Sequence, residues 1–334
     1  MGRQVSDYSR GSAMALGIGF IGLGIMGNRM LTNMSVHGGF DLVAAWDPNE
    51  TARSDARKNY PSLAVFEDVQ EVIKHPDVDV VYIASPPASH RDYALAAADA
   101  GKAVFCEKPL GIDVEQSQEL VEAFKQKDVL NAVNYPLANS QAADLMKADI
   151  DAGKLGKINS VDIRLHFAPW PRDWQQDATW LSLRAEGGFV REVGSHFIYL
   201  TERLLGPAEI LSACAIYPED DVSCETSVQA QFACDNAPVS FHASAGGVGP
   251  DVVEFTIWGE KKSYRLTMWD QLYSTTGDDW IRELSEIEDA RQHGYMRGLD
   301  NLIAWREGKE CSIASFADAL SVQEKVEAIL SGEF

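Results

Sequence analysis

Two side chains in the second half of the sequence have the types and the spacing for proton transfer. Glu192 and His196 are four residues apart, and the apolar residues around them recur at helical intervals: Phe189, Val193, Phe197 and Leu200. Residues four apart share one face of a helix. Because histidine titrates near neutral pH, His196 is suited to remove a hydroxyl proton or to return it. Glu192 could orient the imidazole or hold a substrate, and a histidine on an apolar helix can also be an ordinary core residue.

Lys108 is the third candidate for chemistry. It follows a predicted strand at residues 103–106, and ligands of open α/β sheets bind beyond the carboxyl ends of the strands. Pro109 restricts Lys108 to an extended conformation. A lysine held there can stabilise negative charge that develops on a reacting oxygen. The alternative is a solvated surface lysine.

The first half of the chain alternates apolar strand patterns with helical patterns. Strands are expected at residues 15–21, 41–46, 63–66, 78–84, 103–106 and 130–134. Helices are expected from the glycine turn to about residue 36 and at 50–59, 69–74, 90–100 and 114–127. Strands joined by helices of this length form right-handed crossovers and a parallel, doubly wound Rossmann sheet.

A glycine motif follows the first predicted strand and opens a helix. It reads Gly22-Leu-Gly24-Ile25-Met26-Gly27. In a dinucleotide-binding turn the first glycine permits the tight turn, the second lets the pyrophosphate approach, and the third lets helix and strand pack. The amides of the first helical turn then face the phosphates. The motif predicts a dinucleotide site, and a tight turn without a ligand is the alternative.

Asp47 ends the second predicted strand, 20 positions after Gly27. A carboxylate at this place accepts ribose hydroxyls and repels a 2′-phosphate. Pro48, Asn49 and Glu50 supply no cation, and Arg53 lies a helical turn further on. The sequence therefore favours NAD(H) over NADP(H). Asp47 could instead be only the N-cap of the next helix.

At this point the sequence resembles the Gfo/Idh/MocA family of oxidoreductases, named after glucose–fructose oxidoreductase, inositol dehydrogenase and rhizopine catabolism. The resemblance lies in four segments: the glycine motif, Ser85-Pro-Pro-Ala-Ser-His90, Glu107-Lys108-Pro109-Leu110 and Gly187–His196. The resemblance implies that Lys108 lies beside nicotinamide and substrate, and that the following residues also line the cofactor: Ser85, Pro86, His90 and Glu107. It further implies hydride transfer to or from a secondary alcohol or ketone of a sugar, a cyclitol or a related metabolite.

Three positions depart from the family pattern. Glu192 stands where an aspartate is usual, Tyr199 where a second aspartate is common, and residues 134–139 lack a common arginine. The substrate therefore stays open. Reduction of an imine or another carbonyl is an alternative, as are an NAD-dependent glycosidase and a cofactor-sensing regulator.

The second half predicts an α+β domain with a large, mostly antiparallel open sheet. Strands are expected at residues 158–167, 208–217, 227–233, 239–245, 251–259, 263–268 and 271–274, with a helix at 187–205. A free sheet face suits a dimer or tetramer. By resemblance, a helix at 315–330 returns to the Rossmann domain. We expect a flexible arm at 1–13, the NAD-binding domain at 14–134, and the substrate and oligomerisation domain at 135–334.

An aromatic loop precedes the helix that carries His196. Pro169-Trp170-Pro171-Arg172-Asp173-Trp174 could place Trp170 and Arg172 against a polyhydroxylated substrate, or the same residues could serve loop packing.

Composition excludes several other classes of protein. The net charge of −21 repels nucleic acid and anionic membranes. Five cysteines without a CxxC pair, and seven scattered histidines, predict free thiols in a reducing cytoplasm and no metal site. No apolar run approaches the roughly 18 residues of a membrane span.

Overall fold

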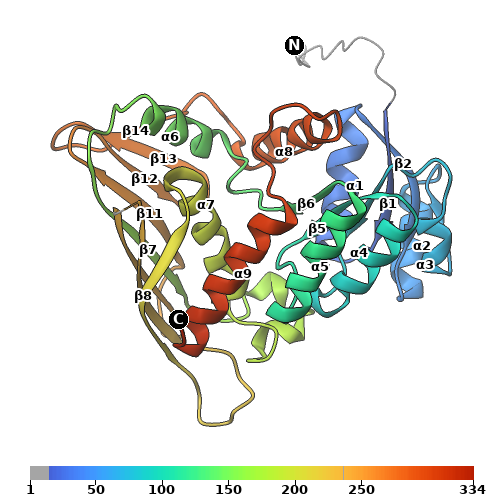
Figure 1. Cartoon of the computed structure of the whole chain (residues 1–334), viewed down its shortest axis with the longest axis horizontal. Helices are drawn as coiled ribbons and strands as arrows, with labels where there is room; N and C mark the ends of the chain where they lie inside the picture. Colours follow the sequence, from blue (N-terminus) through green and yellow to red (C-terminus); the bar gives the residue numbers. More distant parts are fainter. Residues whose placement is uncertain (1–14, 236) are drawn as a thin grey trace.

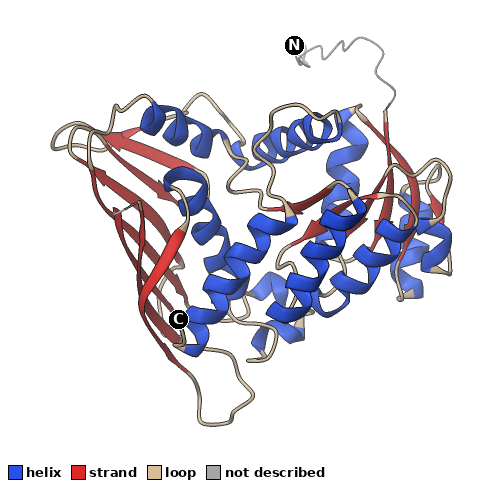
Figure 2. Ribbon diagram, in the orientation of Figure 1, coloured by secondary structure: helices blue, strands red, loops and turns tan. Residues whose placement is uncertain are grey.

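Two β-sheets and the helices packed on them form the chain, which is described here by a computed structural model covering residues 15–235 and 237–334. The arm expected at 1–13 lies outside the described residues. A parallel sheet occupies the N-terminal half and a larger, mostly antiparallel sheet the C-terminal half (Figures 1 and 2). This confirms the predicted fold class.

The N-terminal sheet has six parallel strands in the order β3-β2-β1-β4-β5-β6. Their bounds are β1 Leu16–Ile21, β2 Phe40–Trp46, β3 Ala64–Val65, β4 Val80–Ile83, β5 Ala103–Glu107 and β6 Asn131–Asn134. The chain reverses its direction of strand addition between β1 and β4. Ligands of doubly wound sheets bind at the carboxyl ends on either side of such a switch point.

Helices cover both faces of this sheet. They are α1 Ile25–His37, α2 Glu50–Asn59, α3 Val69–Ile73, α4 His90–Asp99 and α5 Val114–Lys127. Val80 and Tyr82 of β4 belong to one buried cluster, while Val81 and Ile83 belong to the other. The strand β4, which is apolar at every position, is therefore buried on both faces of the sheet, as its unbroken apolar sequence predicted.

The C-terminal sheet has eight strands in the order β14-β13-β12-β11-β7-β10-β9-β8. Their bounds are β7 Ile158–Phe167, β8 Ala208–Ile216, β9 Ser227–Cys234, β10 Ala237–Ala245, β11 Val252–Gly259, β12 Ser263–Thr267, β13 Gln271–Thr275 and β14 Ile281–Arg282. All pairs are antiparallel except β7 with β10. Burial alternates along β7, β9 and β10, so one face packs on helices and the other is exposed. Self-association through the exposed face stays a prediction.

Two helices were not predicted from the sequence. They are α6 (Gln141–Asp151) and α8 (Ala290–Arg306). The Ser140 and Asp289 side chains cap them by accepting backbone N–H groups. α8 packs on α1, and its Leu299 and Leu302 join a buried cluster of the Rossmann domain. The N-terminal domain is therefore completed by a segment from the far end of the chain.

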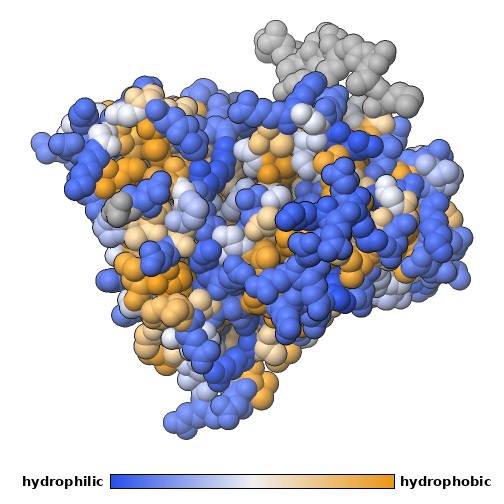
Figure 3. Space-filling view, viewed as in Figure 1, coloured by the Kyte–Doolittle hydropathy of each residue, from blue (hydrophilic) through white to orange (hydrophobic). Residues whose placement is uncertain are grey.

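The remaining long helices lie between the two sheets. α7 (Ser195–Leu205) continues a π-helical turn at Val190–Gly194. α9 (Phe316–Ser331) contacts α5 and β6 of the first domain and α7 and β8 of the second (Figure 1). No helix within the described residues is long and apolar enough to span a membrane. Hydrophilic residues predominate on the face of the molecule that Figure 3 shows.

Candidate active site

The glycine loop between β1 and α1 has the geometry of a phosphate cradle. Gly22 has φ +100°, and a Cβ there would lie 2.6 Å from the Ala84 carbonyl carbon. A Cβ on Gly27 would lie 2.1 Å from the Gly22 oxygen, whereas one on Gly24 would meet nothing within 4 Å. α1 has no side-chain cap and no acid in its first turn, so the amides near Ile25 and Met26 suit a phosphate. The three glycines thus divide into two that are needed for packing and one that faces open space.

This division predicts different outcomes for two alanine substitutions. Gly27→Ala should destabilise the fold by about 1–3 kcal/mol, because the new methyl group overlaps backbone. Gly24→Ala should leave the melting temperature unchanged and weaken NADH binding about tenfold or more, because only the approach of the pyrophosphate is obstructed. Thermal melts and NADH fluorescence titrations measure the two effects. Equal NADH affinity in Gly24→Ala and wild type would contradict the cradle.

Asp47 is fixed by backbone hydrogen bonds on both carboxylate oxygens. Oδ2 accepts from the Leu23 N–H at 2.7 Å and Oδ1 from the Asn49 N–H at 2.8 Å. The N-cap of α2 is Asn49, whose side chain accepts from the Thr51 N–H. The interpretation of Asp47 as a helix cap is therefore wrong. Its carboxylate joins the glycine loop to the end of β2.

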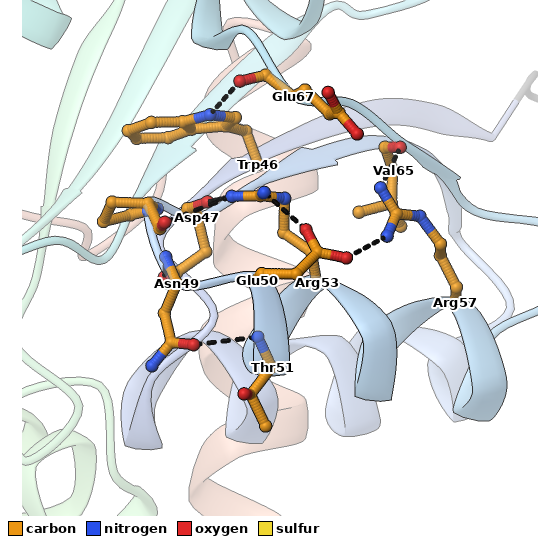
Figure 4. A network of polar contacts seen from close by, with 10 residues as sticks. Trp46, Asp47, Asn49, Glu50, Thr51, Arg53, Arg57, Val65 and Glu67 are labelled. Carbon is orange, nitrogen blue, oxygen red and sulfur yellow. Dashed lines mark hydrogen bonds and ion pairs between the residues drawn. The ribbon is translucent and has the colours of Figure 1, made fainter.

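Arg53 lies closer to Asp47 than the sequence suggested. Its Nη1 donates to the Asp47 carbonyl at 2.6 Å, and its Nη2 pairs with Glu50 (Figure 4). Glu50 also binds Arg57 at 3.1 Å. The guanidinium of Arg53 is thus occupied by a carbonyl and a carboxylate, so a 2′-phosphate would have to break these contacts.

The loops after β4 and β5 are tied together by His90. Its Nδ1 lies 2.9 Å from the Pro109 carbonyl oxygen and its Nε2 lies 2.8 Å from that of Ser85. Burial lowers the pKa of His90, and the two carbonyls partly oppose this shift. His90 therefore ties the loop of Ser85 and Pro86 to Pro109. The cofactor contact expected for His90 stays a prediction.

Glu107 is also buried and bound within the protein. Its Oε1 accepts from the Tyr82 hydroxyl at 2.5 Å and from the Asn134 amide at 2.7 Å. Burial raises the pKa of this carboxyl, although both hydrogen bonds and Lys108 oppose the shift. Glu107 therefore anchors the end of β5 next to Lys108. The cofactor contact expected for Glu107 stays a prediction.

Lys108 and Glu192 meet at the interface between the two domains. The Lys108 ammonium pairs with Glu192 Oε2 and donates to the Glu192 backbone carbonyl at 3.0 Å. The second carboxylate oxygen accepts from Gln175 Nε2 at 3.0 Å. Two of the three ammonium hydrogens are thereby directed, and the third is left for a ligand. The reading of Lys108 as a solvated surface lysine is wrong, because its side chain is only 10% exposed.

His196 lies among aromatic rings and not against Glu192. The Tyr135 and Trp269 rings approach edge-on at centroid distances of 5.7 and 5.5 Å. Nδ1 is buried and has no partner among the described residues, whereas Nε2 is not sealed off. The two carboxylate oxygens of Glu192 bind Lys108 and Gln175, so Glu192 does not orient the imidazole of His196. The open nitrogen Nε2 is the one available for proton transfer.

The environment of His196 changes the expected pH dependence. Burial, followed by the charges of Lys108 and Arg172, lowers the pKa of His196 well below 6.5. The imidazole is therefore neutral, and able to accept a proton, from below pH 6.5 upwards. We expect no rise in the rate of alcohol oxidation through pH 6.5–8 from this group, and a fall only at lower pH. Profiles of kcat/KM against pH test this, and a histidine step near 6.5 would contradict it.

Trp170 and Arg172 of the aromatic loop have different surroundings. The Trp170 indole donates to the Leu181 carbonyl at 3.1 Å and packs on Phe167 and Phe189, so it serves loop packing. Arg172 Nε donates to Gln175 Oε1 at 2.8 Å, and its Nη2 lies 4.0 Å from Glu192. Arg172 therefore belongs to the cluster around Lys108, whereas Trp170 packs within the aromatic loop.

Three residues of the site were missed by sequence reasoning. Gln175 bridges Arg172 and Glu192, while Tyr135 and Trp269 enclose His196. Tyr135 follows directly after β6, and this position at the carboxyl end of a strand was a usable signal. Trp269 lies in a turn, where its φ is +77°. No local sequence pattern indicates that its side chain belongs to the site. The ring of Tyr199 packs against that of Tyr135 at a centroid distance of 4.6 Å, with the two planes tilted by 32°.

The fold and the site together define an architecture: a Rossmann domain and a sheet domain that meet at a cluster of Lys108, Glu192 and His196. Comparison with known proteins agrees with this architecture. The model of an oxidoreductase family with an NAD-binding Rossmann fold matches residues 16–135, and the Gfo/Idh/MocA C-terminal domain matches 144–265. The chain belongs to the Gfo/Idh/MocA oxidoreductase family, which confirms the resemblance.

Several of the relatives are named dehydrogenases. The levoglucosan dehydrogenase of Pseudarthrobacter phenanthrenivorans is 29% identical over 52% of this chain and 44% of its own length. The myo-inositol 2-dehydrogenase of Thermotoga maritima is 24% identical over 70% of this chain and 66% of its own. A levoglucosan dehydrogenase structure with NADH and levoglucosan has a TM-score of 0.84 at 22% identity, with 96% and 97% of the chains covered. The match to the first curated relative thus spans less than half of that protein.

Proposed function

We propose that the protein is an NAD-dependent dehydrogenase or reductase that acts on a secondary alcohol or ketone of a sugar, a cyclitol or a related small metabolite. The observation that carries the proposal is the meeting of Lys108 and Glu192 across the domain interface, close enough to His196 for the lysine charge to lower its pKa. The names of two relatives, dehydrogenases of levoglucosan and myo-inositol, support the substrate class.

Bound NAD would supply the hydride acceptor or donor of the reaction. The residues that fit it are the open Gly24, the uncapped first turn of α1 and the oriented carboxylate of Asp47. The loop of Ser85 and Pro86 flanks the switch point and is proposed to line the cofactor. A direct contact from Lys108 is part of the same proposal.

The chain's own residues divide the work of alcohol oxidation. The Lys108 ammonium, oriented by Glu192, donates to the substrate oxygen and stabilises its negative charge as the hydride leaves. His196 Nε2 takes the hydroxyl proton, because the neutral imidazole is a base over the physiological range. Gln175 fixes Glu192 from the other side. In reduction the proton moves from His196 back to the oxygen.

A panel of sugars, cyclitols, ketones and imines tests the proposal through the absorbance of NADH. Formation of NADH from a sugar or cyclitol supports it. Turnover confined to imines would favour the imine reductase. Retention of NAD with glycoside cleavage and no net NADH would favour the glycosidase. Binding of NAD without any turnover would favour the regulator.

The preference for NAD(H) has its own test at Asp47. Asp47→Asn keeps the shape of the side chain and removes the charge that repels a 2′-phosphate. The ratio of NADH to NADPH affinity should fall about tenfold, the scale of one lost charge interaction. Fluorescence titration with both cofactors measures the ratio. Tighter binding of NADPH than NADH by the wild type would sink the preference.

A further inference from the structure

Arg172 is a nearly buried cation whose hydrogen-bonding capacity is mostly unused. Its side chain is 14% exposed, and Nε is the atom that donates to the protein, at 2.8 Å to Gln175. Within the described part of the chain, Nη1 and Nη2 donate to no protein atom, and neither is sealed from the surrounding space. A guanidinium presents a planar fork of donors on these two nitrogens. The fork of Arg172 is therefore free and reachable.

The neighbouring carboxylates do not satisfy this fork. Glu192 is 4.0 Å away, beyond hydrogen-bond distance, and its oxygens are held by Lys108 and Gln175. The Asp251 carboxylate attracts Arg172 electrostatically without a hydrogen bond to it, and accepts instead from the Ala168 N–H. The exposed Arg291 repels Arg172, because both side chains are cations. Glu192 is thus the carboxylate that lies within ion-pair distance of both Lys108 and Arg172. Burial lowers the pKa of Arg172 because this compensation is incomplete.

Aromatic rings hold the guanidinium in place. It lies 5.5 Å from the ring centroid of Phe167, 5.7 Å from Trp170 and 4.8 Å from Trp174. Such rings attract a cation, but they accept none of its in-plane hydrogen bonds. A planar fork that is mostly buried, held between rings and without a hydrogen-bond acceptor is complementary to a carboxylate, which it can bind with two parallel hydrogen bonds.

We infer that Arg172 forms a carboxylate subsite, so that the preferred substrates are acids, such as hydroxy acids derived from sugars or cyclitols, and not neutral polyols. The subsite lies beside the reacting groups, because Arg172 Nη2 is 4.0 Å from Glu192, and Glu192 pairs with Lys108. The inference rests on the proposed function for the reaction itself. A purely structural Arg172, which only positions Gln175 and Glu192, is the competing explanation.

Matched pairs of hexose and hexuronate separate these explanations: D-glucose with D-glucuronate, and D-galactose with D-galacturonate. Binding to the protein–NADH complex is measured by calorimetry, and kcat/KM is measured with NAD wherever turnover occurs. The wild type should favour an acid over its parent sugar by about tenfold or more, the scale of a charged hydrogen bond. Arg172→Gln should bring this ratio close to one. Arg306→Gln, the same change at an exposed residue on α8, should leave the ratio as in the wild type.

The outcomes also separate the subsite from the proposed function. An acid-to-neutral ratio near one in the wild type, a ratio that survives Arg172→Gln, or no binding of either hexuronate overturns the subsite. Equal losses for acids and neutral sugars in Arg172→Gln would show a positioning residue instead. Selective binding of a hexuronate without hydride transfer to any compound would sink the proposed function and keep the subsite.

Discussion

Replacing Lys108 by alanine is expected to lower the turnover of alcohol oxidation by about a hundredfold to a thousandfold, the usual effect of removing one donor to a developing oxyanion. The ammonium is oriented by two contacts with Glu192, so its remaining hydrogen is fixed in direction. Lys108→Arg should not restore full activity, because a planar fork cannot occupy the place of a compact ammonium. Steady-state kcat with NAD in excess measures the effect.

Glu192→Gln provides the control for this prediction. If Glu192 acts by holding Lys108, the double variant Lys108→Ala/Glu192→Gln should be little worse than Lys108→Ala alone, because the two residues act as a unit. NADH affinity should stay close to that of the wild type in Glu192→Gln, whereas the two variants that lack Lys108 should lose part of it, because Lys108 is itself proposed to contact the cofactor. Wild-type turnover in Lys108→Ala would remove the lysine from the mechanism.

The Rossmann half could be predicted from the sequence because its signals are local. Its central strands β1 and β4 are buried on both faces and so have unbroken apolar sequences, and the glycine motif lies between the first strand and helix. The helix α8 gave no such signal. It contains Gly294 and Gly298, and its packing partner α1 lies more than two hundred residues earlier in the chain. Tertiary contact, and not local propensity, forms this helix.

The shape of the turn that carries Glu192 was beyond sequence reasoning for a similar reason. A regular helix was expected, but residues Val190–Gly194 form a π-helical turn. The buried Glu225, from a distant segment, accepts from the Val190 N–H at 2.8 Å, and its carboxylate leaves no room for a side chain at Gly188, where φ is +98°. The spacing of Glu192 and His196 was recognisable, whereas their separate partners depend on these long-range contacts.

Replacing His196 by alanine should lower the turnover by about a hundredfold or more, the usual contribution of a positioned acid or base. The imidazole is neutral because burial and two cations lower its pKa, and its Nε2 is the open nitrogen. NADH affinity should barely change. His242→Ala, the same change on the exposed face of β10, should retain the wild-type rate and serves as the matched control.

A lost base can be distinguished from a collapsed core by chemical rescue. His196→Ala leaves a space beside Tyr135 and Trp269 that imidazole added to the solution can enter. Restoration of part of the turnover by imidazole, rising with the fraction of neutral imidazole as the pH increases, would show that proton transfer was the missing step. His196→Asn, which keeps a polar side chain but supplies no base, should be as slow as His196→Ala. If either variant turns over at nearly the wild-type rate while folded and able to bind NADH, His196 is a core residue and another group takes the proton.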